Sequence, residues 1–308
     1  MTDPLFPRVT LIGLGLLGAS LGLAIKRAGL AREVVGTDHD EAVRATALSL
    51  GIVDETKPTA VAAAENADLV ILCTPVGTLT ALTQELAPAL KAGAILTDVG
   101  SVKATFARDA AVLMPKDVHF IPGHPVAGTE QSGPEAGFAE LFDGRWCILT
   151  PPDGTDETAL SKLTSFWEGC GAKVEVMNAA HHDLVLAITS HIPHLIAYNI
   201  VGTAADLETV TQSEVIKYSA GGFRDFTRIA ASNPEMWRDI FLSNKDAVLE
   251  MLGRFSEDLS ALQRAIRYGD ADGLHTLFTR TQAIRKQIID AGQESPEANF
   301  GRQTSSKE

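Results

Sequence analysis

Short apolar segments rich in β-branched residues recur along the first 176 residues, and helix-favouring stretches separate them. Segments of this kind, bounded by Gly, Pro or Asp, predict buried parallel strands with helices crossing between them. We expect strands at Val9–Ile12, Glu33–Thr37, Leu69–Thr74, Ala94–Thr97, Val118–Ile121 and Trp146–Thr150. The alternation predicts an α/β domain with a doubly wound sheet of the Rossmann type over residues 1–176.

The pattern changes after Met177, where long stretches of helical periodicity replace the short apolar segments. Residues 177–292 therefore predict an all-helical C-terminal domain. We expect helices at about 179–206, 209–218 and 233–291, the last broken near Gly269 and Asp270–Gly273. Residues 293–308 are polar and lack periodicity, which predicts a disordered tail.

Composition and charge narrow the classes of partner. The chain has 308 residues, enough for two domains, and a formal net charge of -13. That charge argues against nucleic acid and anionic membrane surfaces, because both need a basic face. Cys73, Cys147 and Cys170 show no CxxC spacing and predict free thiols in a reducing compartment. We see no signal-peptide layout and no apolar run approaching the roughly 20 residues of a membrane span, so we expect a soluble, cytoplasmic protein.

A glycine-rich turn follows the first expected strand. Gly13, Gly15 and Gly18 form a GxGxxG pattern, and Leu16 and Leu17 open the next helix. In a dinucleotide site the first glycine permits the tight turn, the second lets the backbone approach the pyrophosphate, and the third allows close packing. The pyrophosphate then lies at the N-terminus of the helix. The alternative is a tight turn without a ligand, which the strand, the helix and a suitably spaced acid disfavour.

The acid is Asp38, at the end of the second expected strand. A carboxylate there accepts hydrogen bonds from the ribose hydroxyls and repels a 2′-phosphate, and no arginine follows it directly. NAD is therefore favoured over NADP, with a surface turn as the alternative role for Asp38. Thr74 and Pro75 end a later strand and are expected beside the nicotinamide.

Two polar segments at strand ends carry candidate chemistry. Oxidation of an alcohol by hydride transfer needs a base for the hydroxyl proton, and neutral histidine suits this role. His124, in GHPVAGTE, is the candidate base, and Ser101, in DVGSVK, is expected to orient it or to bind the same hydroxyl. The alternative is that His124 only caps a Gly–His–Pro turn.

Four further histidines and an acid lie in the first expected helix of the second half. His191 and His194 are three residues apart on one helical face, with Asp183 earlier on the same helix. The HxxH spacing suggests a metal site, but no third ligand is evident and hydride transfer needs no metal, so we predict none. The alternative for His191 is a helix–helix interface. His182, like its neighbour His181, is expected at the surface.

Cations gather in one segment of this acidic chain. They are Lys217, Arg224, Arg228 and Arg238, interleaved in KYSAGGFRDFTRIAASNPEMWRD. An arginine fork is the natural clamp for a carboxylate, which makes Arg228 the predicted anion anchor. Ion pairs with the neighbouring acids are the alternative for some of the others.

Taken together, these motifs resemble the prephenate/arogenate (cyclohexadienyl) dehydrogenase family over roughly Val9–Ala291. The segments that carry the resemblance are GLGLLGASLG, DVGSVK, GHPVAGTEQSG, SHIPH and GGFRDFTRIAASNPEMWRDI. The resemblance implies NAD-dependent oxidative decarboxylation in tyrosine biosynthesis. It also implies a Rossmann-type domain, a helical dimerisation domain that makes a homodimer, and an active site between them.

The resemblance also implies roles for single residues. His124 matches the catalytic histidine, and Ser101 matches the serine that helps to position it. His194 and Arg228 match substrate-site residues, Arg228 as the anion anchor. The other matches all concern the surroundings of the substrate: Thr129 and Glu130 in a closing segment, Gly221 and Trp237 in the ligand wall, and Asp183 as a residue that reaches a neighbouring subunit's site.

Substrate preference depends on the side chain, which carries a keto group in prephenate and an amino group in arogenate. An inward-facing Glu130 attracts the ammonium of arogenate, so we expect arogenate to be accepted well; the alternatives are a solvent-facing Glu130 or a pair with Arg145. A β-hydroxyacid dehydrogenase, a pyrroline-carboxylate-type reductase and a non-catalytic NAD sensor are rival interpretations. The GHPVAGTE and DFTRIA segments and the retained polar residues disfavour them.

Overall fold

The structure, a computed structural model, describes residues 3–129, 131–211 and 221–290, with the side chains of 207–211 left aside. By the density of internal contacts the chain divides into two compact units, Met1–Met251 (unit 1) and Leu252–Glu308 (unit 2). The expected boundary after residue 176 stays a prediction from the sequence. Glu130, Lys217 and the expected tail at 293–308 lie outside the described residues.

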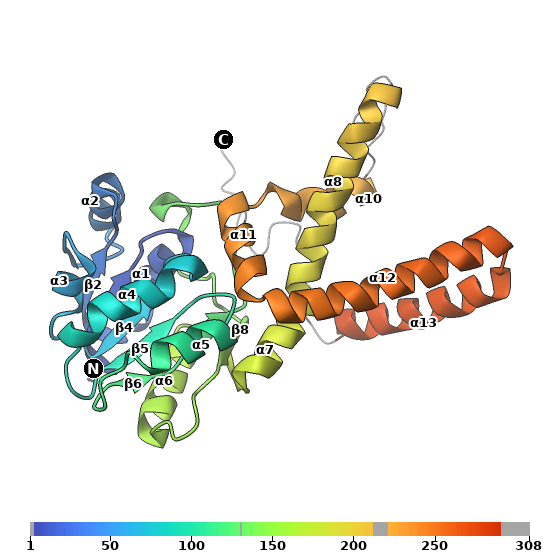
Figure 1. Cartoon of the computed structure of the whole chain (residues 1–308). Helices are drawn as coiled ribbons and strands as arrows, with labels where there is room; N and C mark the ends of the chain where they lie inside the picture. The colour runs from blue at the N-terminus through green and yellow to red at the C-terminus, as the bar shows by residue number, and fades with distance from the viewer. Residues whose placement is uncertain (1–2, 130, 212–220, 291–308) are drawn as a thin grey trace. The chain divides into compact units, whose positions relative to one another are not determined.

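Unit 1 contains a six-stranded parallel sheet with the order β3-β2-β1-β4-β5-β6 (Figure 1). The strands are β1 Phe6–Ile12, β2 Ala31–Thr37, β3 Glu55–Thr56, β4 Leu69–Leu72, β5 Ile95–Asp98 and β6 His119–Phe120. The chain runs outward from β1 to β3 and then returns to β4 on the other side of β1. Ligands of doubly wound sheets bind at such a switch point, beyond the carboxyl ends of the strands. The predicted Rossmann-type domain is confirmed.

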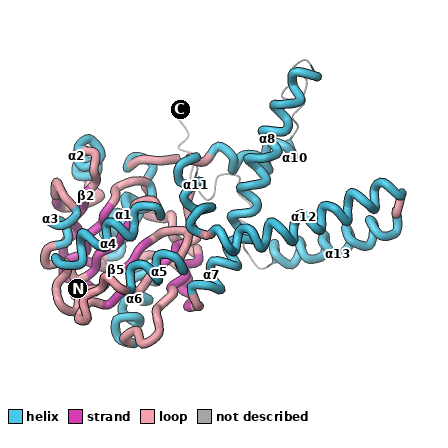
Figure 2. The backbone as a smooth tube through the Cα atoms, in the orientation of Figure 1, coloured by secondary structure: helices cyan, strands magenta, loops and turns pink. Residues whose placement is uncertain are grey.

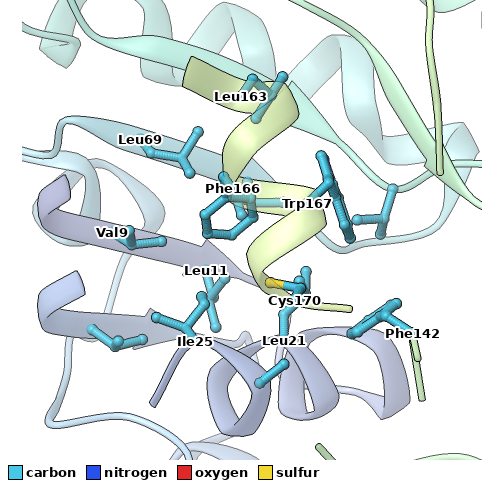
Figure 3. Packing of buried hydrophobic residues seen from close by; sticks show 14 of the residues in the cluster. Val9, Leu11, Leu21, Ile25, Leu69, Phe142, Leu163, Phe166, Trp167 and Cys170 are labelled. Atoms are coloured by element: carbon cyan, nitrogen blue, oxygen red, sulfur yellow. The ribbon is translucent and has the colours of Figure 1, made fainter. Parts of the chain in front are cut away.

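Helices lie on both faces of this sheet (Figure 2). They are α1 Leu16–Ala28, α2 Glu41–Ser49, α3 Ala60–Ala64, α4 Leu79–Leu86, α5 Ala104–Ala111 and α6 Glu157–Gly169. Because side chains alternate along a strand, Val9 and Leu11 join one core cluster and Ile12 joins another. The first cluster receives α1 and α6, including Phe166 and Trp167 (Figure 3). The second receives side chains of α3, α4 and α5.

The segment expected as a sixth parallel strand belongs to a different sheet. β7 Gly123–Pro125, β8 Trp146–Leu149 and β9 Lys173–Val176 form a three-stranded sheet in which β7 and β8 are antiparallel. The strand predicted at Trp146–Thr150 is confirmed as β8 and pairs in parallel with β9, but it lies outside the six-stranded sheet in which we expected it. A crossover to a parallel neighbour usually contains a helix, whereas the described residues between β7 and β8 form only the short 3-10 turn Pro134–Ala136.

Helices follow β9, as predicted. They are α7 Ala179–Leu186, a π-helical turn Ala187–His191, α8 Ile192–Thr211, α10 Gly221–Thr227, a 3-10 turn Arg228–Ala231, α11 Pro234–Ser243, α12 Lys245–Tyr268 and α13 Ala271–Asp290. The predicted break is confirmed at Gly269, which has φ +68°. A second break at Asn244 was not predicted. Of the expected helix at 209–218, all but the first three residues lie outside the described part.

Among the described residues, one helical span is apolar enough, by length and composition, to cross a bilayer. It is Ala179–Asp206, with a mean hydropathy of 1.5. Our sequence expectation did not include such a span. It also carries buried His182, Asp183 and His191, which hydrogen-bond within the chain. Those contacts explain the span as a helix of unit 1.

Candidate active site

The glycine turn after β1 leaves no room for side chains at two of its positions. Gly13 has φ +97°, and a Cβ there would lie 2.9 Å from Thr74 Cγ2. A Cβ on Gly18 would lie 2.0 Å from the carbonyl oxygen of Gly13. A Cβ on Gly15, in contrast, would meet no atom within 4 Å. Packing thus requires Gly13 and Gly18, whereas Gly15 borders open space.

The helix that follows the turn is oriented to receive an anion. α1 begins at Leu16 and Leu17, and its N-cap residue Gly15 provides no side-chain capping bond. Its first N–H groups therefore point toward the open side of Gly15, where the helix dipole also favours negative charge. These features fit the pyrophosphate of a dinucleotide.

Asp38 lies where the cofactor prediction placed it. Its Oδ2 accepts the backbone N–H of Leu14 at 2.9 Å, and its Oδ1 accepts that of Asp40 at 3.1 Å. The carboxylate is therefore attached to the glycine turn at the end of β2. Arg44 donates from Nη1 to the carbonyl oxygen of Asp38 at 2.6 Å. The arrangement suits a ribose diol.

Thr74 and Pro75 come after Cys73 at the end of β4, on the opposite side of the glycine turn from β2. The Cys73 N–H donates to Ile12 O at 2.7 Å, and the Thr74 methyl is the neighbour that a Gly13 side chain would strike. The Thr78 hydroxyl lies 2.8 Å from that of Thr74. The carboxyl ends of β1 and β4 thus meet at this point.

A fully buried ion pair joins the two strand ends that carry Ser101 and His124. Lys103 Nζ pairs with the Asp98 carboxylate and donates to Gly123 O at 2.8 Å. Asp98 in turn accepts Gly100 N at 2.8 Å and Gly123 N at 3.2 Å. Because Gly100 precedes Ser101 and Gly123 precedes His124, one carboxylate anchors both neighbours. The DVGSVK segment contains both partners, but the ion pair between them was not predicted from the sequence.

Burial and attraction act in opposite directions on this pair. Burial raises the pKa of the Asp98 carboxyl, and the charge and hydrogen bond of Lys103 oppose that rise. Burial lowers the pKa of Lys103, and Asp98 opposes that fall. The pair stays ionised only while both partners are present.

His124, on β7, is buried and is the first residue in a series of polar contacts. Its Nδ1 lies 2.8 Å from Nε2 of His182, and Nδ1 of His182 lies 2.8 Å from Asp183 Oδ1. Burial lowers the pKa of His124 well below 6.5, and burial also lowers that of His182. His182 is 0% exposed, so its expected surface position was wrong, whereas His181 is exposed as predicted. In the sequence, the i, i+4 spacing of His182 to Leu186 was the signal that could have indicated a buried position for His182.

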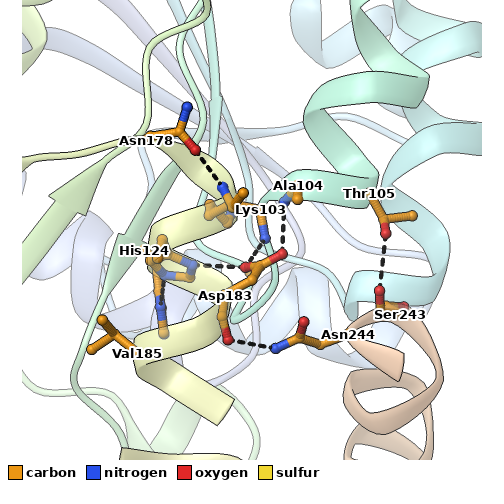
Figure 4. A network of polar contacts seen from close by, with 12 residues as sticks. Lys103, Ala104, Thr105, His124, Asn178, Asp183, Val185, Ser243 and Asn244 are labelled. Atoms are coloured by element: carbon orange, nitrogen blue, oxygen red, sulfur yellow. Dashed lines mark hydrogen bonds and ion pairs between the residues drawn. The ribbon is translucent and has the colours of Figure 1, made fainter. Parts of the chain in front are cut away.

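Asp183 is engaged in hydrogen bonds within its own chain. Its two carboxylate oxygens accept the N–H groups of Lys103 and Ala104, each at 2.8 Å (Figure 4). These are donors at the start of α5, which carries no other side-chain cap. The free N–H groups of a helix start attract a carboxylate, which explains why Asp183 points toward the start of α5.

The π-helical turn before α8 brings His191 into the interior. Asn244 Nδ2 lies 3.1 Å from His191 Nδ1 and donates to Asp183 O at 2.8 Å. Burial lowers the pKa of His191 to about 4. The helix–helix interface that we gave as the alternative role of His191 is confirmed. The two bonds of Asn244 also explain why α11 and α12 are separate helices.

His194 forms the polar face of an aromatic cluster. Its ring stacks on Trp237 with centroids 3.7 Å apart, and its Nδ1 donates to Ser190 O at 2.8 Å. Burial lowers the pKa of His194, and the nearby positive charge of Arg228 adds to this effect. Trp237 and His194 are thus brought together with the predicted anion anchor Arg228.

Two donors beside this cluster are buried and lack partners within the described residues. They are Trp237 Nε1 and His191 Nε2. The aromatic ring centroids of the two residues are 6.1 Å apart. Buried donors of this kind are usually satisfied in proteins, so a polar ligand or water is the natural partner.

Other predicted substrate residues have only local contacts. The Thr129 hydroxyl accepts Gln131 N at 3.2 Å in a loop turn, and Gly221 begins α10 at an exposed position. Two further cations from the same segment form exposed ion pairs with adjacent acids, the alternative that we considered. They are Arg224 with Asp225 and Arg238 with Asp239.

Comparisons with known proteins agree with this geometry. The family model for the prephenate dehydrogenase nucleotide-binding domain matches residues 21–176, and that for the prephenate dehydrogenase dimerization domain matches residues 178–280. The chain is 41% identical over 280 residues to a cyclohexadienyl dehydrogenase of Zymomonas mobilis, covering 91% of this chain and 95% of that protein. It is 34% identical over 278 residues to a prephenate dehydrogenase of Bacillus subtilis, covering 90% of this chain and 75% of that protein.

A solved structure is similar over almost the same range. It is the prephenate dehydrogenase from A. aeolicus in complex with hydroxyphenyl propionate and NAD+. The TM-score is 0.86 at 36% sequence identity, and the match covers 92% of this chain and 98% of that one.

Proposed function

The chain belongs to the prephenate dehydrogenase family, and on that premise we propose that it catalyses the NAD-dependent oxidative decarboxylation of a cyclohexadienyl substrate, prephenate or arogenate, toward tyrosine. The observation that carries the proposal is the placement of His124. This buried histidine is tied by the Asp98–Lys103 pair to the loop of Ser101, at the same end of the sheet as the glycine turn.

The cofactor is NAD, and the residues at the carboxyl ends of β1, β2 and β4 fit it. The N–H groups at Gly15, Leu16 and Leu17 suit the pyrophosphate, and Asp38 suits the ribose hydroxyls. Thr74 and Pro75 border the nicotinamide end of the site. When bound, the nicotinamide ring accepts a hydride from ring carbon C4 of the substrate.

His124 acts as the base in this reaction. It takes the proton of the C4 hydroxyl as the hydride departs, which leaves a ketone at C4. The ketone withdraws electrons, the C1 carboxylate leaves as carbon dioxide, and the ring becomes aromatic. Because burial lowers the pKa of His124, its ring is neutral at physiological pH and has a lone pair available. Ser101 binds the same hydroxyl or orients His124.

Arg228 provides the anion anchor, supported by the polar groups around it. Its charge acts on His194, which stacks on Trp237. A planar guanidinium matches a carboxylate, and the buried N–H groups of Trp237 and His191 are further donors for the same ligand. Thr129 and Gly221 complete the proposed substrate surroundings.

Preference between the two substrates remains a hypothesis from the sequence, because Glu130 lies outside the described residues. An inward carboxylate favours the ammonium of arogenate. We expect Glu130→Gln to lower the ratio of arogenate to prephenate kcat/KM by several-fold. An unchanged ratio in steady-state rates would remove the hypothesis.

We also propose a homodimer in the cytoplasm. The name of the family model for residues 178–280 supports the dimer, as do the exposed apolar residues of α12 and α13: Leu259, Ile266, Phe278, Ile284, Ile288 and Ile289. The three free cysteines support a reducing compartment. Light scattering of the purified chain tests the dimer, and a fluorescent fusion in the source cell tests the location.

The activity is tested by following NADH formation with prephenate and arogenate offered separately. We expect turnover with at least one, and a loss of about 10²- to 10⁴-fold in His124→Asn while NAD still binds. His119→Asn is the matched control, because His119 lies on β6 outside the site. An absence of turnover with both substrates, despite NAD binding, would contradict the proposal.

A further inference from the structure

We propose that His182 and Asp183 are positioning residues that hold His124 in its reactive tautomer, an inference that rests on the proposed function. The three side chains form a continuous line from Asp183 through His182 to His124, with 2.8 Å between each pair of contacting atoms. All three are buried, with exposed fractions of 4%, 0% and 7%. Water is therefore excluded as the partner that sets their hydrogen bonds.

The direction of the hydrogen bonds follows from the acceptor at one end. The Asp183 carboxylate can only accept while ionised, so Nδ1 of His182 carries the hydrogen that points to it. Two backbone amides, at Lys103 and Ala104, donate to the same carboxylate and fix its orientation. Asp183 therefore defines the tautomer of its neighbour.

That tautomer determines the next one. A neutral His182 with its hydrogen on Nδ1 presents a lone pair at Nε2, and His124 must then donate from Nδ1. His124 consequently has its lone pair on Nε2, the nitrogen that does not face His182. In the opposite tautomer two lone pairs would meet at 2.8 Å in a buried position, which costs the desolvation of both. The reactive nitrogen is thus fixed before substrate binds.

The charges around the two rings are consistent with neutral histidines. Burial is the main reason why the pKa values of both His124 and His182 are lowered. The titratable and charged groups that act on the two rings are Lys103, Asp98, Asp183 and His191, and the Cys147 thiol lies beside them on β8.

The same line of contacts supports the charge that develops during reaction. The hydroxyl proton of the substrate moves to His124 Nε2, and His124 becomes an imidazolium whose Nδ1–H still points to His182. No proton has to pass to His182 or Asp183, since their hydrogen bonds only strengthen as the positive charge appears. Removing His182 should therefore impair the chemical step more than substrate binding.

The test compares three substitutions in the full chain. His182→Phe keeps a ring but removes both nitrogens, and His182→Gln keeps a donor and an acceptor. His181→Phe is the matched control, because it makes the same change on the exposed neighbour. For His182→Phe we expect kcat to fall by about 10- to 100-fold with KM and NAD affinity little changed. The acid limb of its pH–rate profile should also move to lower pH, because the imidazolium of His124 loses its acceptor.

Recovery by the glutamine variant separates positioning from packing. His182→Gln should regain most of the lost kcat and return the acid limb toward that of the parent. Rates within about threefold of the parent for His182→Phe would overturn the proposal. Equal losses in the phenylalanine and glutamine variants with an unmoved acid limb would also overturn it, since that result indicates a packing role.

A spectroscopic measurement keeps this inference distinct from the proposed function. In protein labelled with ¹⁵N-histidine, the nitrogen shifts of His124 report which nitrogen carries the hydrogen. We expect the Nδ1–H form in the parent and a mixture in His182→Phe. An Nε2–H form in the parent overturns the inference, even if the enzyme turns over. The Nδ1–H form supports it even if both substrates fail and the proposed function with them.

Discussion

The cofactor side and the chemical side of unit 1 lie at the same end of one sheet. The cofactor side is formed mainly by backbone groups, and the chemical side by buried polar side chains. On the cofactor side, the turn Gly13–Gly18 depends on side chains that are absent and on backbone groups. On the chemical side, the Asp98–Lys103 pair and the line from Asp183 to His124 depend on polar side chains removed from water. The first should be sensitive to volume, and the second to charge and protons.

The comparison shows how precise placement can be reached in two ways. Backbone atoms in a tight turn need no partner for their position, because sterics and the sheet define it. Buried charges are stable only when every partner is present, so each also serves as an anchor for the others. Asp98 illustrates this, since it holds residues next to both Ser101 and His124.

The largest expected effect is on the chemical side. Lys103→Met should lower the free energy of unfolding by about 3–5 kcal/mol, because Asp98 would remain buried without its partner. Urea denaturation measures the change. Arg238→Met is the control: the Arg238 side chain is 60% exposed in its pair with Asp239, and loss of this pair should cost at most about 1 kcal/mol. Equal changes in the two variants would contradict the distinction between the sides.

An intermediate loss of stability is expected when the pH is lowered. The pKa of His191 is lowered from 6.5 to about 4 in the folded protein, so below pH 6.5 the unfolded chain binds more protons than the folded one. Stability is thus full above pH 6.5 and decreases as the pH falls toward about 4, by roughly 3 kcal/mol from His191 alone. His124 and His182 act in the same direction.

Urea unfolding at about pH 7 and about pH 4.5 measures this loss. His191→Phe should make the pH dependence shallower. His39→Gln, on the cofactor side, should leave it as it is, because the His39 side chain is 98% exposed. The same pH dependence in His191→Phe and the parent would show that buried histidines do not govern the acid response.

The smallest change in stability should come from adding a single methyl group to the glycine turn on the cofactor side. Gly18→Ala places a Cβ against Gly13 O and should lower stability by about 1–3 kcal/mol. Gly15→Ala meets no atom, so stability should change by no more than about 0.5 kcal/mol while NAD binds more weakly. Urea denaturation and NAD titration check both variants. Equal stability losses would show that open space at Gly15 has no special role.

Local patterns were sufficient where local physics decides the structure. The glycine turn and Asp38 could be predicted because a strand, a turn, a helix and an acid follow one another in a short segment. The helix break at Gly269 was equally local, since its φ of +68° suits glycine. The alternation of strands and helices predicted a doubly wound sheet, but neither its strand order nor the short β3 at Glu55–Thr56 was predicted.

Contacts between distant segments explain what could not be predicted. His182 is the fourth residue of its helix and polar, and only the packing of α7 on α5 makes it a buried residue. The break at Asn244 comes from its bonds to Asp183 and His191, which local sequence does not encode. Burial of Lys103 was not predicted, because it depends on Asp98 and on Gly123, which is twenty residues away in the sequence.

Asp183 caps α5, and this contact limits which helical segments could be joined to the N-terminal part of the protein. A fragment that ends at Val176 would keep the whole glycine turn and all six parallel strands. It would nevertheless leave the amides of Lys103 and Ala104 without their acceptor and His124 without the ring behind it. A foreign helical segment could replace the native one only if it brought its own His–Asp pair to the same place. We therefore expect the two halves to be exchangeable only together, although their folds belong to different classes.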